Sequence, residues 1–65
     1  MEKYGVILAK GDTVTTLETC GSREAVIVAS QLHRRRHSRD EGNIAAAQGN
    51  FDESGRLDRR SFRIL

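Results

Sequence analysis

The sequence contains no proline and no tryptophan, and it has a single cysteine, Cys20. Without proline, no stretch resembles a rigid linker, so the chain is expected to form one domain, 1–65. One cysteine excludes an internal disulfide. The sequence also has no CxxC pair and no Cys/His cluster, so it gives no sign of a structural metal. A lone cysteine is typical of a reducing cytosol. The fold is therefore expected to stand without the covalent or metal cross-links that many small domains use.

Long hydrophobic stretches are missing as well. No apolar run approaches the ~20 residues that a membrane-spanning helix needs, and residues 1–10 lack the pattern of a signal peptide. We therefore expect a cytoplasmic protein with no membrane contact. A chain of this length buries only about 60% of the surface of its extended form. Dimerisation would supply more buried area, so a homodimer is one expectation.

The stretch 22–37 is the only segment long enough for a well-packed helix. Ser22 is a favoured N-cap residue, and Glu24 places a negative charge at the positive end of the helix dipole. Apolar positions recur at intervals of three and four, which predicts a sheet-facing stripe of Ala25, Val28, Ala29, Leu32 and the stem of Arg36. Because β-branched residues lose rotamer freedom in a helix, a buried strand at 25–29 is the alternative.

Ile27 points away from the predicted stripe, towards the polar side of the helix. One interpretation places Ile27 in a contact with a second chain. The other is that an isolated exposed apolar residue is ordinary on a protein surface.

Four short segments show the alternation of β-strands, namely 3–9, 13–19, 44–51 and 56–64. The first has apolar residues on both faces, which predicts a central strand, whereas the threonine-rich second fits an edge with a bulge or half burial. The alanines of 44–51 would also suit a helix, but Gly49-Asn50 favours a strand. Turns are predicted at Gly11-Asp12 and at 52–55.

Together these elements predict an α+β domain of two layers, ββαββ, with one helix packed on a four-stranded, mostly antiparallel sheet. In the last strand, the side that carries Phe62 and Ile64 is expected to turn towards the helix. The opposite face of the sheet is expected to stay uncovered, and either this open face or an edge strand is expected to meet a partner.

Arginines gather at the predicted helix end and in the last strand. Their planar guanidinium groups suit bidentate contacts with phosphate, so the two sets would form one nucleic-acid surface if those segments were neighbours. The residues of this candidate surface are Arg34, Arg35, Arg36, Arg39, Arg59, Arg60 and Arg63. The alternative is a solvated surface with local ion pairs, because the formal net charge is only +2 and aromatic stacking residues are few.

No catalytic constellation emerges from the sequence. His33 and His37 have the spacing of a helical metal pair, but only two ligands are evident and cations surround them. Cys20 precedes the helix N-terminus, where a thiolate is stabilised, yet no base can be assigned to it. We therefore predict no catalytic residue, no metal and no cofactor.

The tail that begins at Gly42 and contains the FDESG turn at 51–55, read after two strands and a helix, resembles very small ββαββ proteins of bacterial conjugative transposons and other mobile elements. The resemblance implies an accessory or binding role and assigns no functional residue. The leading hypothesis from the sequence is a non-enzymatic interaction module with a protein partner or a second copy of itself. The second hypothesis is nucleic-acid binding.

Overall fold

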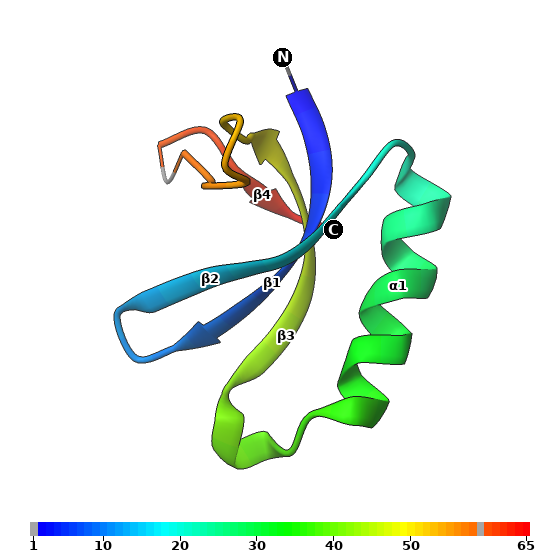
Figure 1. The fold of residues 1–65 in the computed structure, drawn as a ribbon, viewed down its shortest axis with the longest axis vertical. Helices are drawn as coiled ribbons and strands as arrows, with labels where there is room; N and C mark the ends of the chain where they lie inside the picture. The colour runs from blue at the N-terminus through cyan, green and yellow to red at the C-terminus, as the bar shows by residue number, and fades with distance from the viewer. Residues whose placement is uncertain (1, 59) are drawn as a thin grey trace.

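The computed structural model describes residues 2–58 and 60–65 and shows one helix packed against one face of a four-stranded antiparallel sheet (Figure 1). In chain order the elements are β1 (Glu2–Lys10), β2 (Thr13–Cys20), α1 (Arg23–Arg36), the 3-10 turn η1 (Arg39–Glu41), β3 (Asn43–Asn50) and β4 (Arg63–Ile64). The strand order is β2-β1-β3-β4, and each neighbouring pair is antiparallel. The predicted ββαββ fold is confirmed.

β1 is a central strand and β2 is an edge strand, as the sequence predicts. The register of the two strands shifts so that Val6 faces Glu18 but Ile7 faces Thr16, which leaves Leu17 as an extra residue in a β-bulge. The predicted strand at 44–51 is confirmed as β3, and the helical alternative for that segment is wrong.

The N-terminus of α1 is built as predicted, because the hydroxyl of Ser22 accepts a hydrogen bond of 3.2 Å from the backbone N–H of Ala25. Because residues 25–29 lie within α1, the alternative of a buried strand there is wrong. Its orientation differs from the prediction, however. Val26 and Ser30 are buried against the sheet, with 0% and 2% exposure, whereas Val28 and Leu32 are 57% and 47% exposed.

The helix-side cluster, formed by Val6, Val26 and Ala46, explains this rotation. Ser30 can be buried in the same layer because its hydroxyl donates a hydrogen bond of 2.8 Å to the backbone carbonyl of Ile27. The side chain of Ile27 is half-buried and packs against the helix-side cluster. Its predicted position on the outer side of the helix is therefore wrong.

The face of the sheet away from α1 is also covered, contrary to the prediction. The far-side cluster consists of Ile7, Ala47, Phe51 and Leu57, so residues that follow β3 fold back over the sheet. The ring of Phe51 lies over Gly5, where an added Cβ would be only 2.5 Å from the ring atom Cζ. Glycine is thus required at this position by close approach of the ring.

The turn at 52–55 forms as predicted. One carboxylate oxygen of Asp52 accepts hydrogen bonds from the backbone N–H groups of Ser54 and Arg56, at 3.0 and 2.8 Å. Gly55 takes a φ of 84°, which favours glycine. The hydrogen bond from the Ser54 hydroxyl, followed by the one from the Arg56 N–H, lowers the pKa of Asp52.

The long strand predicted at 56–64 is wrong, because β4 spans only Arg63–Ile64. Leu57 and Phe62 both pack on the far side of the sheet, although a straight strand would place residues five apart on opposite faces. The chain therefore turns between them, where a carboxylate oxygen of Asp58 accepts a hydrogen bond of 2.9 Å from the Arg60 N–H. Phe62 does not face the helix, and Ile64 is 55% exposed.

Candidate interaction surfaces

The side of α1 that faces away from the sheet carries an apolar outer stripe, which consists of Ala25, Val28 and Leu32. All three side chains are exposed. At 3.6 residues per turn, Glu24 and Arg35 fall along the same flank of this stripe, near its two ends. The outer stripe is thus an apolar strip bordered by a negative charge at one end and a positive charge at the other.

The helix therefore has two stripes, and the sequence pattern revealed only the outer one. The residues that face the sheet include Val26, Ser30 and His33, whose spacing is also helical but which are mixed in polarity. A search for regularly spaced apolar residues predicts that Val28 and Leu32 are buried. It misses the true sheet-facing side because serine and histidine are polar and are not expected to be buried.

The chain also exposes more surface than its mass predicts. Its accessible surface is 4788 Å² for a mass of 7.3 kDa, whereas the scaling found for folded monomers gives about 4200 Å². The exposed surface includes four large apolar side chains, Val28, Leu32, Ile64 and Leu65.

Two histidine–carboxylate pairs fasten the C-terminal half of α1. Nε2 of His33 lies 2.9 Å from a carboxylate oxygen of Glu18 in β2, and Nδ1 of His37 lies 2.6 Å from one of Glu41 in η1. The hydrogen bond with His37, and next the N–H of Ser38, lower the pKa of Glu41. The two rings stack 5.9 Å apart. Each histidine ring thus contacts its own carboxylate, and the two rings do not point to one common site of the kind that a helical metal pair requires.

A shallow hollow of about 240 Å³ lies at the C-terminal end of α1 and is lined in part by Arg34, His37 and Arg39. Nε of Arg34 donates a hydrogen bond of 3.2 Å to the carbonyl of Ile44, which anchors the guanidinium at the rim. Arg35 and Arg36 are exposed on the last turn of the helix beside it. The hollow has the positive charge that a phosphate group requires.

The arginines of the C-terminal segment lie elsewhere. The end of α1 and the segments 52–58 and 60–62 occupy opposite ends of the molecule (Figure 1). Arg60 is exposed in the second of these segments, Arg63 pairs with Gln48 in the sheet, and Arg59 lies outside the described residues. Arg60 therefore does not join the arginines at the end of α1 in the single surface that the sequence suggested.

Cys20 lies at the end of β2, half-buried beside the helix-side cluster. Burial, and then the negative charge of Glu18, raise the pKa of its thiol. A raised pKa lowers the thiolate fraction, so this environment does not activate a nucleophile. Within the part of the chain that the structure describes, no three His, Cys, Asp or Glu side chains gather as ligands for a metal.

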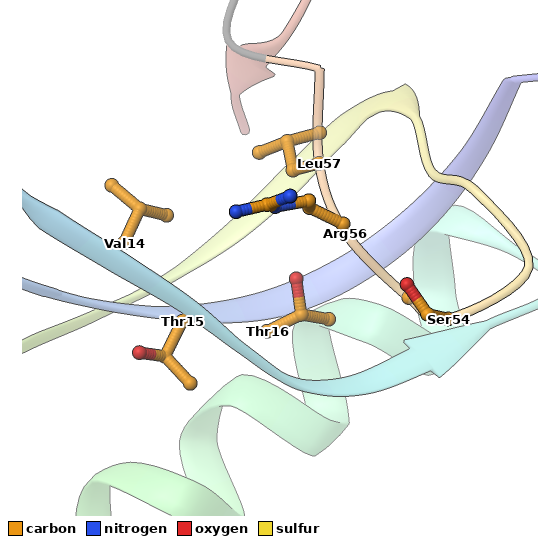
Figure 2. Close-up of a pocket in the computed structure, with 7 residues that line it drawn as sticks. Val14, Thr15, Thr16, Ser54, Arg56 and Leu57 are labelled. Atoms are coloured by element: carbon orange, nitrogen blue, oxygen red, sulfur yellow. The ribbon is translucent and has the colours of Figure 1, made fainter.

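A groove of about 540 Å³ separates β2 from the turn that follows β3. Figure 2 shows Val14 and Thr16 on the groove side of β2, with Thr15 pointing the other way. The side chain of Arg56 reaches from the turn across the groove towards β2 (Figure 2). In the described part of the chain, no ion pair within 4 Å involves its guanidinium. Sequence reasoning missed this groove, because it arises only when 51–62 folds back.

Comparison with known proteins finds no matching family model, no similar curated protein and no similar solved structure. The resemblance to mobile-element proteins therefore stays a prediction. For the residues described here, no helix has both the length and the apolar character that a bilayer crossing requires.

Proposed function

We propose that the chain is a small non-enzymatic interaction module that works as a homodimer through the outer stripe of α1. The observation that supports this best is the exposure of Val28 and Leu32 at 57% and 47% on one helix face. Helix faces that carry apolar side chains at intervals of three and four normally lie against another element. The sheet does not occupy this face, so a second copy of the helix is the partner that we propose.

Charge complementarity favours an antiparallel pair of helices. If the two-fold axis passes near the level of Ser30, Val28 of one copy lies beside Leu32 of the other. The same arrangement brings Glu24 close to Arg35 of the second copy, on the same flank of the stripe, and does so twice by symmetry. A parallel pairing would instead set Glu24 level with Glu24 and Arg35 level with Arg35, so that no opposite charges meet.

The outer stripe is small, so the expected dimer is weak. Standard interfaces bury about 800 Å² on each partner, and one face of a 14-residue helix with three apolar residues offers less. We therefore expect dissociation in the micromolar range or above.

Replacing Leu32 with arginine should convert the dimer to a monomer. The substitution puts a charge in the centre of the proposed contact but leaves the fold intact, because Leu32 is exposed within each subunit. Sedimentation equilibrium over a concentration series measures this. Ile64→Arg is the matched control, since Ile64 is 55% exposed against 47% for Leu32 but lies in β4, and this variant should dimerise as the wild type does. A monomeric wild type at millimolar concentration would contradict the proposal.

The antiparallel register has its own test. Glu24→Arg and Arg35→Glu should each weaken the dimer, because each brings like charges together, and the double substitution should restore it. Circular dichroism checks that the helix survives these changes at its two ends. If the two single substitutions weakened the dimer equally and their effects simply added in the double variant, the antiparallel register would be excluded.

Nucleic-acid binding at the end of α1 is the second candidate, favoured by the hollow that Arg34, His37 and Arg39 line. A phosphate in this hollow would face two guanidinium groups, which are suited to bidentate contacts. The carboxylate of Glu41 next to His37 reduces the local positive charge, so only a few phosphate contacts are expected.

Arg34→Gln combined with Arg39→Gln should weaken the binding of a short DNA duplex and lower the slope of log K against log salt by about two. Electrophoretic mobility shift across a salt series measures both quantities. Arg60→Gln serves as the control, because it removes one exposed charge that does not line the hollow. A wild-type protein that shifts no DNA at low salt would remove this candidate.

A further inference from the structure

We infer that the free edge of β2, together with the groove beside it, binds an extended segment of another protein that carries an acidic side chain. This site is separate from the outer stripe of α1, so the inference does not depend on the homodimer.

The edge of β2 offers backbone groups for a further strand. β1 is the only described strand that pairs with β2, so the N–H and C=O groups on its other side point away from the sheet. Such an edge is a template for strand addition unless proline, lysine or a bulge blocks it. The run from Thr13 to Thr16 contains none of these, because the bulge begins only at Leu17. The open edge is therefore about four residues long.

The groove lies beside this same short run. In an added strand, residues opposite Val14 and Thr16 would place their side chains on the groove side, and the residue opposite Thr15 would point the other way. The edge would bind the backbone of the partner, and the groove would contact its alternate side chains, as in other sites that bind peptides by strand addition.

Arg56 determines the chemistry of the partner. Its backbone N–H donates a hydrogen bond to Asp52, which positions the residue on a tight turn, and its side chain lies across the groove (Figure 2). A glutamate or aspartate on the groove side of the added strand would meet a guanidinium that makes no ion pair within 4 Å among the described residues, although its charge also acts on the carboxylate of Asp52. The partner segment is thus extended and acidic at a groove-side position.

The probe is a fluorescein-labelled peptide, acetyl-Thr-Val-Glu-Val-Thr-amide, with versions that carry glutamine or lysine in place of glutamate. Fluorescence anisotropy should give the tightest binding for the glutamate peptide, and Arg56→Gln should weaken it by about fivefold, the effect of one exposed charge-assisted contact. Arg56→Glu should reverse the preference in favour of the lysine peptide. Arg60→Glu is the matched control in the same segment and should leave the preference unchanged.

Two further measurements locate the bound peptide. Backbone N-methylation of alternate peptide residues should abolish binding if strand addition is the mode, and amide shifts on binding should concentrate at residues 13–16. Equal affinity for the glutamate and lysine peptides, unchanged binding after N-methylation, or no binding at millimolar peptide would each overturn the inference. Running the series in the Leu32→Arg variant as well separates this result from the fate of the homodimer.

Discussion

Val26→Asp is expected to abolish cooperative unfolding, whereas Val28→Asp, two residues along the same helix, is expected to be nearly neutral. Val26 is fully buried between α1 and the sheet. An aspartate there would lose the burial of a valine, worth about 2 kcal/mol, and would place an unpaired charge in an apolar cluster. For 65 residues, the total free energy of unfolding is only about 3–10 kcal/mol.

Val28 is the matched control because the change in chemistry is identical and the side chain is 57% exposed. Surface substitutions usually alter the free energy of unfolding by about 0.5 kcal/mol or less. Urea denaturation followed by circular dichroism measures both variants, in the Leu32→Arg background so that dimerisation does not contribute. If Val28→Asp unfolded the protein and Val26→Asp did not, the orientation of the helix described above would be wrong.

Phe51→Ala is expected to lower the free energy of unfolding by about 3–5 kcal/mol, as large-to-small changes of buried aromatics do. Phe51 is 7% exposed and packs with Ile7, Ala47 and Leu57. Without its ring, the segment that follows β3 would lose its main contact with the sheet. Thermal and urea denaturation both report this loss.

The contact between Phe51 and Gly5 provides an internal check on that prediction. Gly5→Ala should destabilise the wild type, because the new Cβ would lie 2.5 Å from the ring of Phe51. In the Phe51→Ala background the same substitution should be far less harmful, so the two effects should be strongly non-additive. Additive effects would mean that the ring does not lie over Gly5 in solution.

Local signals in the sequence were sufficient for most of the elements. Ser22 marked the start of the helix because its side chain satisfies a backbone N–H that the helix itself cannot. The pair Gly49-Asn50 and the turn at Asp52 correctly favoured a strand over a helix at β3. These signals depend on residues that are close in sequence, which is why they could be interpreted without the tertiary structure.

The errors all came from contacts between distant segments. Ser30 and His33 face the sheet, although polarity alone argued against both positions. The hydroxyl of Ser30 is satisfied within the helix by the carbonyl of Ile27, whereas His33 finds its partner in the sheet, the carboxylate of Glu18. The alternation in 56–64 resembled a strand, but Leu57 and Phe62 are held on one face by the far-side cluster.

The candidate sites were affected in the same way. The arginine set could be listed from the sequence, yet whether its two halves meet depends on where 52–58 and 60–62 pack, and these segments pack far from the end of α1. The outer stripe was found as a pattern but assigned to the wrong side of the helix. The groove beside β2 had no sequence signal, because its walls come from residues about forty apart.

The orientation of α1 determines which residues are buried and which form the outer stripe, so it is the central claim. Nuclear Overhauser contacts between methyl groups test it most directly. Val26 should show contacts to the methyl groups of Val6 and Ala46, since these three form the helix-side cluster, and Val28 should show none to either. Contacts from Val28 or Leu32 to Val6 and Ala46 within one subunit would contradict the account.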